Sequence, residues 1–497
     1  MTDAKDLILG SKINRILAII LGLGFVFRLL FLGTRQLWTD EIMQGLVVRA
    51  SSVREMLEGL RDGMAIPAPL DYFVQKGIVS VLGESTWTMR LHAVIFGTLS
   101  LWVFFRIARY LFGDRVAIYS TILLTFYPLH YHYSQEGRPY ALLILLSLLA
   151  YDLLFRILSK DDGRFVPWAL LCATLTVLLY ASFLGVLVLG SQWVALVISA
   201  VWDPRDTQAP SATGQGDDPY SRIGRARGWH VLAYSVAAGV ACALYVPWVY
   251  FAWAKPLVSR VSEVVDPRLV LRMIKELGDG SYPMAGLLLL GAGTGVQALR
   301  RHGQRRTLMW LLTWFGVSIP AVILIEIWSG YFFAIRHILH ATPPLILLAG
   351  YGLSYIGERL TILERLPSRL SAPSIGYAVL VILISVWIAQ SHWKKETEDW
   401  LGTARFLQNN LRPGDVVTMP AVYLLLEYNA PVLRSFRVGD LDPGAGSLGS
   451  GEISRRFVAC FNHLKPDPCE GFRAPAAKDG AWRRQEFRGF TVFMRDK

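Results

Sequence analysis

Eleven long apolar runs divide this 497-residue chain and constrain its fold more than any other feature. Spanning a bilayer takes about 20 apolar residues per helix. The third run is short, and the fifth and sixth nearly touch at Ala181-Ser182, so we expect these two to form a tight re-entering pair. The pattern predicts an α-helical polytopic membrane protein with about 11 transmembrane helices. The approximate limits of the runs are 14–33, 90–111, 115–131, 139–158, 166–181, 183–202, 229–251, 282–299, 307–327, 338–356 and 374–391.

The basic residues indicate how the chain is oriented. The net charge of +12 could suggest nucleic-acid binding, but Lys and Arg fall mainly in short loops between the apolar runs. This is the pattern of the positive-inside rule, so we expect no nucleic-acid partner. The first run is too long for a cleavable signal peptide and is expected to remain as a membrane helix. With the N-terminus cytoplasmic, the basic clusters lie inside. The outer segments are then 34–89, 132–138, 252–281, 328–337 and everything after 392.

Two domains follow from this hydropathy. Residues 1–391 form the transmembrane domain, and residues 392–497 are expected to form a small external α/β domain. The host membrane is expected to be a bacterial inner membrane with the C-terminal domain periplasmic. The outside would be the ER lumen if the host is eukaryotic.

Three further segments complete the expected organisation. The outer loop 34–89 contains amphipathic stretches at 41–60 and 69–82, which either lie on the membrane surface or pack on the protein. Segment 203–228, rich in Pro, Gly, Asp and Ser, is predicted to be a flexible cytoplasmic loop. In the external domain, 400–411 is expected to be helical, and 416–419 and 490–494 are expected to be strands.

The four cysteines divide into two pairs. Cys172 and Cys242 lie inside apolar runs and are expected to be small core residues. Cys460 and Cys469 lie in the polar C-terminal region and could form a disulfide in an oxidising compartment. A zinc site there is disfavoured, because His463 alone lies nearby and the spacing fits no common metal pattern.

The first candidate site is the stretch Trp38-Thr39-Asp40-Glu41, which opens the first outer loop. Two adjacent carboxylates at a membrane face could act in catalysis. Thr39 could equally cap a helix, since acids in a first helical turn are favoured by the helix dipole. Spacing alone does not decide between these two interpretations.

Two more polar clusters fall on the same side of the membrane. The short connection 130–140 contains Glu136, Arg138 and Tyr140. Glu136 and Arg138 could pair with each other, or Glu136 could face the acidic pair while Arg138 binds an anion. The other cluster, 331–337, places Arg336 among aromatic residues. This arginine either snorkels to the interface or binds phosphate, for which its fork is well shaped.

Carboxylates, arginines and aromatic rings at one membrane depth match a substrate with a hydrocarbon tail, a phosphate and a sugar. The tail would lie in lipid, the phosphate on arginine, and the sugar on the aromatic faces beside the acids. Sugar transfer needs a base to deprotonate the attacking hydroxyl, and it needs stabilisation of the leaving phosphate. The three clusters together therefore favour an enzyme.

The order of these pieces resembles the GT-C superfamily of integral membrane glycosyltransferases. It is most similar to the branch with the protein O-mannosyltransferases and the bacterial aminoarabinose transferase of lipid A (glycosyltransferase families 39 and 83). The pieces that carry the resemblance are Trp38-Thr39-Asp40-Glu41, Pro67-Ala68-Pro69-Leu70-Asp71-Tyr72, Arg90-Leu91, Glu136-Gly137-Arg138-Pro139-Tyr140-Ala141-Leu142, and Arg336-His337 with Pro343-Pro344. One departure is Ile66-Pro67-Ala68, where many relatives have a histidine.

The resemblance implies a polyprenyl-phosphate-linked sugar donor and inverting transfer of a hexose or pentose on the outer leaflet. It makes Asp40 the general base, with Glu41 or Glu136 assisting in acceptor orientation or metal binding. The substrate-binding residues would be Trp38, Arg90, Arg138, Tyr140, Tyr331, Arg336 and His337.

Several points stay open at this stage. Asp40 and Glu136 could hold Mg²⁺ or Mn²⁺, hard cations that favour oxygen ligands. The acceptor could be a glycan, a lipid or a protein of the cell envelope. The competing class is a lipid or polysaccharide transporter or flippase, which we disfavour because the chain shows no obvious repeat and few ionisable residues within its spans. A catalytically inactive scaffold of the same fold is a third alternative.

Overall fold

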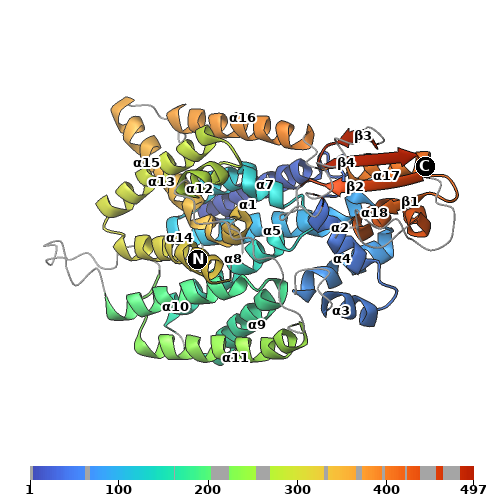
Figure 1. The fold of residues 1–497 in the computed structure, drawn as a ribbon. Helices are drawn as coiled ribbons and strands as arrows, with labels where there is room; N and C mark the ends of the chain where they lie inside the picture. Colours follow the sequence, from blue (N-terminus) through green and yellow to red (C-terminus); the bar gives the residue numbers. More distant parts are fainter. Residues whose placement is uncertain are drawn as a thin grey trace, which may run out of the picture.

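The computed structural model describes residues 4–61, 68–161, 163–202, 223–252, 269–329, 334–364, 372–394, 398–419, 423–436, 455–462, 469 and 482–496. Each expected apolar run overlaps a helix (Figure 1). Among the described residues, five helices are long and apolar enough to cross a membrane: 86–112, 140–160, 228–252, 282–301 and 305–324. The helices that overlap the runs are α1 (Ala4–Leu29), α5 (Thr86–Phe112), α6 (Asp114–Phe126), α8 (Tyr140–Lys160), α9 (Phe165–Ala181), α10 (Gly185–Val201), α11 (Gly228–Ala252), α13 (Tyr282–Arg301), α14 (Arg305–Ser329), α15 (Pro343–Glu364) and α16 (Ala372–Lys394).

Helix α8 lies at the centre of the bundle. It packs against α5, α9 and α10, and its side chains are buried nearly all round. A helix that is apolar on every face belongs inside a bundle rather than at its surface. Tyr151 of α8 stacks on Trp314 of α14 with ring centroids 3.7 Å apart. This central helix fixes the position of its own N-terminal residue, Tyr140, which borders the candidate site.

The structure corrects two helix boundaries and shows how the fifth and sixth runs meet. The run at 338–356 does not begin a helix at 338, because residues Ile335–Ala341 form a 3₁₀ helix (η1) and α15 starts at Pro343, a residue suited to a first helical turn. The run at 115–131 breaks at Tyr127, and Pro128 starts the short α7 (Pro128–Tyr133). The fifth and sixth runs are separate helices that contact each other, joined by residues 182–184.

The expected first outer loop packs on the protein. It contains α2 (Thr39–Val48), α3 (Val53–Arg61) and α4 (Pro69–Leu82), so the stretch 41–60 is two helices rather than one. Buried Val47, Met56 and Tyr72 share one apolar cluster with Trp248 of α11. Of the two arrangements expected for these helices, packing on the protein is therefore the one observed. Another short helix, α12 (Leu269–Leu277), precedes α13.

The C-terminal region contains a four-stranded sheet of order β1-β2-β4-β3. Strands β1 and β2 are parallel, and the other two pairs are antiparallel. The expected helix and strands at 400–411, 416–419 and 490–494 are confirmed, whereas β2 and β3 were not predicted. The elements are α17 (Trp400–Asn410), β1 (Val416–Thr418), α18 (Tyr423–Asn429), η2 (Pro431–Phe436), β2 (Arg455–Phe461), β3 (Trp482–Phe487) and β4 (Phe490–Asp496).

The core of this region continues into the expected first outer loop. Trp400 packs on Phe490, and the same apolar cluster includes Leu37, Ile42 and Met89. Figure 1 shows the sheet, α17, α18 and the loop helices α2 and α4 together at one end of the long helices. In β2, Cys460 is disulfide-bonded to Cys469.

Candidate functional site

The N-terminus of α2 is fixed by Glu41. Trp38 is the N-cap residue, and its backbone N–H donates to Glu41 Oε2 at 3.4 Å. Thr39 is therefore the first helical residue rather than the cap. Glu41 also accepts from Arg90 Nε at 2.7 Å, from Arg90 Nη2 at 2.6 Å and from the Gly137 N–H at 2.7 Å. Both carboxylate oxygens of Glu41 are thus occupied by protein donors.

Glu41 and Arg90 form a buried ion pair, with their side chains 0% and 1% exposed. Burial alone would raise the pKa of Glu41, but the charge and hydrogen bonds of Arg90 and the Gly137 amide outweigh it and lower the pKa. Arg90 in addition donates to the backbone carbonyls of Leu32, Arg35 and Gln36. The pair therefore joins the end of the first helix to α2 and α5, and it gives both residues a structural part in holding the site.

Gly137 has to be a glycine at this junction. A Cβ on it would lie 2.7 Å from the Met89 carbonyl oxygen and 3.4 Å from Glu41 Oε1. The close approach lets the backbone N–H of Gly137 reach the carboxylate. It also places the next residue, Arg138, against α2.

Arg138 lies beside the half-buried Asp40. Its Nη1 donates to the backbone oxygen of Asp40 at 3.2 Å and to Gln44 Oε1 at 3.2 Å. Burial works to lower the pKa of Arg138, but the charge of Asp40 is the largest opposing influence and the pKa is raised. Arg138 is therefore a permanent cation next to the expected base, and it is only 3% exposed.

A second arginine approaches from another segment. The guanidinium of Arg336, in η1, lies 5.9 Å from the centre of the Trp38 ring. Although burial works to lower its pKa, Tyr140 and Asp40 raise it, so this side chain also stays charged. Two arginines from loops about 200 residues apart in sequence thus face the same acid.

These side chains enclose a small pocket. It is lined by Arg138, Tyr140, Arg336 and His337, all expected to bind substrate, together with Ala68, Tyr72, Pro139 and residues 182–184. Burial raises the pKa of Tyr72 to about 12, even though Arg138 opposes the shift, so Tyr72 keeps its hydroxyl proton and can donate a hydrogen bond. A pocket with two cations and phenolic donors is suited to an anionic group.

Glu136 belongs to a different contact. Its Oε1 lies 3.0 Å from His132 Nε2, and the other ring nitrogen of His132 lies 3.1 Å from Asp279 Oδ1. Burial works to lower the pKa of His132, but Asp279 and Glu136 raise it to about 9. The Oε2 atom of Glu136 is buried and has no hydrogen-bond partner among the described residues. Glu136 thus keeps one acceptor atom free.

The start of the same connection, 130–140, has a structural role. His130 contacts Arg28 Nη2 at 2.8 Å and Ser100 Oγ at 2.8 Å, both within the helical bundle. Gln135 Nε2 donates to the carbonyls of Arg28 and Leu30 at 2.8 Å each, which satisfies the end of α1. The first part of the connection therefore holds α1 in place, and its last part contributes residues to the candidate site.

Sequence reasoning missed three contributors. Gln44 Nε2 donates to Asp71 Oδ2 at 2.7 Å while Gln44 Oε1 accepts from Arg138, so Gln44 and Asp71 orient the arginine. Asp71 belonged to a motif that carried the resemblance, but no role followed from it. The connection 182–184 had no polar signal beyond Ser182. Tyr331 lies outside the described residues, and so do residues 62–67, which include Ile66 and Pro67 at the start of the 67–72 motif.

A divalent cation stays a prediction. Among the described residues, no group of three or more His, Cys, Asp or Glu side chains is arranged to hold a metal ion. The free Oε2 of Glu136 and the carboxylate of Asp40 remain the two oxygen donors proposed for Mg²⁺ or Mn²⁺. The charge on an anionic ligand would meet Arg138 and Arg336 directly.

The helices and this pocket define a polytopic membrane protein with a pocket lined by two arginines at one end of its bundle. Comparisons with known proteins agree with that class. Residues 67–206 match the sequence profile of the dolichyl-phosphate-mannose-protein mannosyltransferase family. Among curated proteins, none matches the chain.

Solved structures match over nearly the whole chain. ArnT from Cupriavidus metallidurans in the apo state is 15% identical, with a TM-score of 0.58 over 96% of this chain and 97% of that one. ArnT of the same organism bound to undecaprenyl phosphate gives 14% identity and a TM-score of 0.52 over the same shares. The Archaeoglobus fulgidus oligosaccharyltransferase in the apo form gives 11% identity and a TM-score of 0.50, covering 83% of this chain and 64% of that one.

The chain therefore has the GT-C fold of integral membrane glycosyltransferases, with a small C-terminal sheet domain, and the resemblance drawn from its motifs is confirmed. The family match over residues 67–206 supports a glycosyltransferase. It covers α4 through α10 and hence Arg90, Arg138 and Tyr140 of the site.

Proposed function

We propose that this protein transfers a hexose or pentose from a polyprenyl-phosphate donor to an acceptor of the cell envelope, with inversion at the anomeric carbon. The observation that carries the proposal is the meeting of Arg138 and Arg336 with Tyr140 and Tyr72 in one pocket beside Asp40. Undecaprenyl phosphate is the ligand named for one ArnT structure of the same fold, which supports this class of donor.

The two arginines would bind the donor phosphate. Charge-assisted hydrogen bonds to a buried guanidinium are roughly twice as strong as neutral ones. They strengthen further as the bond between sugar and phosphate breaks and negative charge develops on the leaving oxygen. Arg138, held by Gln44 and the Asp40 carbonyl, is preorganised for this task.

Asp40 would act as the general base. The acceptor hydroxyl attacks the anomeric carbon, its proton passes to the Asp40 carboxylate, and the bonding electron pair leaves with the phosphate oxygen. Asp40 is better suited than Glu41, because Glu41 is fully buried and committed to Arg90. Glu136, with its free Oε2, would orient the acceptor or contribute to a Mg²⁺ or Mn²⁺ site.

Transfer would take place on the outer face of a bacterial inner membrane, with the N-terminus cytoplasmic and the C-terminal domain periplasmic. The basic loops support this orientation. They lie at the opposite ends of the same helices from the pocket: for example, α8 runs from Tyr140 in the pocket to Lys160. The acceptor is proposed to be a periplasmic glycan, lipid or protein.

Mass spectrometry of cell-envelope glycans and lipids from a deletion strain tests the proposal. We expect the deletion to remove one sugar modification, which names the sugar and its acceptor together. The wild-type gene should restore it. The Asp40→Asn variant should accumulate in membranes but restore less than about 1% of the modification, since general-base catalysis contributes about 10²–10⁴-fold.

Asp114→Asn is the matched control, because Asp114 pairs with Arg109 at the other end of the bundle. It should restore the modification fully. Full restoration by Asp40→Asn would remove Asp40 as the base. An unchanged envelope in the deletion strain would favour the transporter or inactive-scaffold alternatives.

A further inference from the structure

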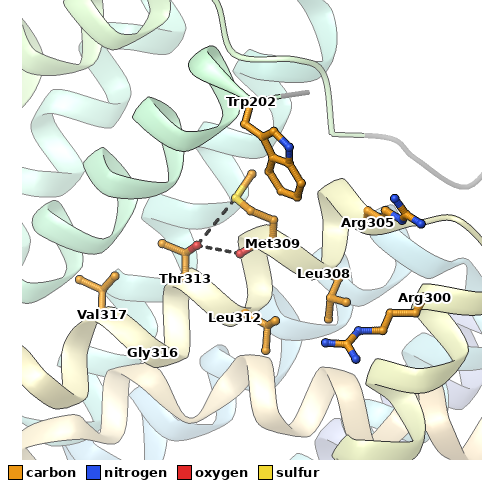
Figure 2. A pocket seen from close by; sticks show the side chains of 9 residues that line it. All are labelled: Trp202, Arg300, Arg305, Leu308, Met309, Leu312, Thr313, Gly316 and Val317. Atoms are coloured by element: carbon orange, nitrogen blue, oxygen red, sulfur yellow. Dashed lines mark hydrogen bonds between the residues drawn. The ribbon is translucent and has the colours of Figure 1, made fainter. Parts of the chain in front are cut away.

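A groove at the other end of the bundle has no part in the proposed reaction. It runs along α14 between the end of α10 and the end of α13 (Figure 2). Helix α14 has 25 residues, so its start lies about 37 Å along the axis from the end that leads to η1 and the pocket. The lining residues are Trp202, Arg300, Arg305, Leu308, Met309, Leu312, Thr313, Gly316 and Val317.

The groove is cationic at its entrance and apolar along its length. Arg300 and Arg305 are exposed and lie at the helix ends that form the α13–α14 turn. Figure 2 shows the Trp202 ring next to the Met309 side chain, and the Arg300 guanidinium beside Leu308. The hydroxyl of Thr313 is bonded to the Met309 carbonyl at 2.8 Å, so it presents no free donor to the groove. Tryptophan and arginine together are typical of a membrane–water interface.

Gly316 keeps the floor of the groove open. It is exposed, and a Cβ built on it meets no atom within 4 Å. Leu312 nearby is 42% exposed. A hydrocarbon chain could therefore pass Gly316 on this face of α14 without meeting another side chain there.

The length of the groove matches one leaflet. Val317 is twelve residues beyond Arg305, or about 18 Å along a helix axis. Half of a typical hydrocarbon core is about 15 Å. An acyl chain whose headgroup sits at the two arginines would therefore end near Val317. A polyprenyl chain is far longer than this groove.

We propose that this groove binds an anionic glycerophospholipid of the leaflet opposite the pocket, with the phosphate and headgroup on Arg300 and Arg305 and one acyl chain along α14. The charge of the entrance selects anionic over zwitterionic headgroups, because each arginine near the surface attracts an anionic lipid. The apolar floor selects a lipid over free phosphate.

Native mass spectrometry of the full-length protein in detergent tests this site. Phosphatidylglycerol and phosphatidylcholine with identical acyl chains are titrated in parallel, and inorganic phosphate is included as a headgroup without a tail. We expect phosphatidylglycerol to bind at least about fivefold more tightly than phosphatidylcholine, and we expect each arginine removed to weaken phosphatidylglycerol binding about fivefold. Inorganic phosphate should not compete.

Two variants and two matched controls locate the binding. Arg300→Gln should weaken phosphatidylglycerol about fivefold. Its neighbour Arg301, which donates to the Tyr355 hydroxyl and does not line the groove, provides Arg301→Gln as the charge-matched control with unchanged affinity. Gly316→Leu should weaken both lipids by filling the floor. Gly239→Leu, at an equally open and exposed position of α11, should change neither.

Three outcomes would overturn the proposal. One is equal affinity for the two lipids, and another is equal loss in Arg300→Gln and Arg301→Gln. The third is tighter binding of a long polyprenyl phosphate than of phosphatidylglycerol in a manner sensitive to Gly316→Leu, which would assign the groove to a different lipid.

Discussion

Thr39, the residue before Asp40, is held by Glu398 from the far end of the chain. The backbone N–H of Thr39 donates to Glu398 Oε2 at 2.8 Å, and its hydroxyl donates to the same oxygen at 2.6 Å. That oxygen also accepts the indole N–H of Trp400 at 2.7 Å. Gln36 reinforces the contact by donating to Asp399 Oδ1 at 3.0 Å. The C-terminal domain therefore supplies the cap for the helix that carries the expected base.

Removing this cap should lower activity without removing the protein from the membrane. Glu398→Ala leaves one buried donor and two part-buried donors without this partner, at a cost of at most about 1–3 kcal/mol each. A displaced α2 would move Asp40, and a shift of about 1 Å can lower kcat by about 100-fold. Glu398→Gln should retain more activity because its carbonyl oxygen can still accept.

The control for Glu398 is Glu486→Ala, on the exposed face of β3. Transfer kinetics of the purified variants check the prediction. If Glu398→Ala kept the kcat of Glu486→Ala, the C-terminal domain would not position α2.

Substitutions of Glu41 and Asp40 should differ in their effect on the unfolding temperature. Breaking a buried ion pair costs about 3–5 kcal/mol, so Glu41→Gln should unfold at a clearly lower temperature. Asp40→Asn should lower the melting temperature less than Glu41→Gln, because Asp40 is half-buried and the hydrogen bond from Arg138 to its backbone oxygen is kept. Intrinsic tryptophan fluorescence during heating reports both.

Two further results refine the Glu41 prediction. Removing both partners in Glu41→Gln/Arg90→Met should cost less than the two single changes together, because no lone charge stays buried. The lowered pKa of Glu41 means that its contribution is present above about pH 4.3 and is lost as the pH falls below that value. Stability between pH 6 and 8 should therefore not depend on Glu41 protonation. Additive losses in the double variant would contradict the coupling.

His132 should stabilise the protein less as the pH rises into the alkaline range. Its pKa is raised to about 9 in the folded protein, mainly by Asp279 acting against burial, whereas an unperturbed histidine has a pKa of about 6.5. A raised pKa gives stabilisation that is complete below about pH 6.5 and is lost as the pH rises through about 9. The melting-temperature difference between wild type and His132→Gln should be largest near pH 6 and should shrink toward pH 9.5.

His302→Gln controls for a general effect of histidine loss, since His302 is exposed and contacts the Tyr351 hydroxyl at the far end of α13. Its melting-temperature difference over the same range shows how much of any pH dependence is common to histidine substitutions. If the melting-temperature difference between wild type and His132→Gln did not change with pH, His132 would carry no charge between Asp279 and Glu136.

The sequence predicts the membrane helices well, because hydropathy is a local signal. Three residues singled out from the sequence, Arg138, Tyr140 and Arg336, do line one pocket, and Asp40 lies near both arginines. What the pattern cannot assign is which of two adjacent acids is buried. Glu41 accepts hydrogen bonds from Arg90, 49 residues away in sequence, and this contact depends on tertiary packing rather than on sequence spacing.

Long-range contacts explain the other misses. Gln44 looks like a surface residue of an amphipathic helix, yet it is buried between Asp71 and Arg138. Glu398 lies 359 residues from Thr39, in a region where no motif marked it. Strand β2 pairs with β4 across a long connection, so its role depends on partners that periodicity does not reveal.

The disulfide should be detectable by thiol labelling. Cys460 and Cys469 are fully buried and bonded, whereas Cys172 and Cys242 are free. In a Cys172→Ala/Cys242→Ala background, a maleimide reagent should label no cysteine of the denatured protein before reduction and two after it. Labelling of both without prior reduction would refute the bond. Removing it with Cys460→Ser should cost the C-terminal domain about 2–3 kcal/mol, measured by limited proteolysis.

Substitution of Arg336 tests whether this side chain binds the donor phosphate or only snorkels to the membrane interface. It lines the pocket with Tyr140 and His337, and its guanidinium faces the Trp38 ring. If it binds the donor phosphate, Arg336→Ala should raise the donor KM or lower kcat, with a loss in kcat/KM of about 100-fold from removing a charge-assisted contact of about 3 kcal/mol. Arg336→Lys should recover only part of that loss, because an ammonium group cannot present a two-pronged donor.

The KM for the acceptor should respond differently from the KM for the donor in the same experiment. Acceptor KM should change little in Arg336→Ala, since the base and Glu136 lie on other segments. Arg359→Ala is the matched control, because Arg359 stacks on Tyr355 near the opposite end of α15 from η1. Unchanged donor kinetics in Arg336→Ala would identify Arg336 as an interfacial anchor and leave Arg138 as the phosphate ligand.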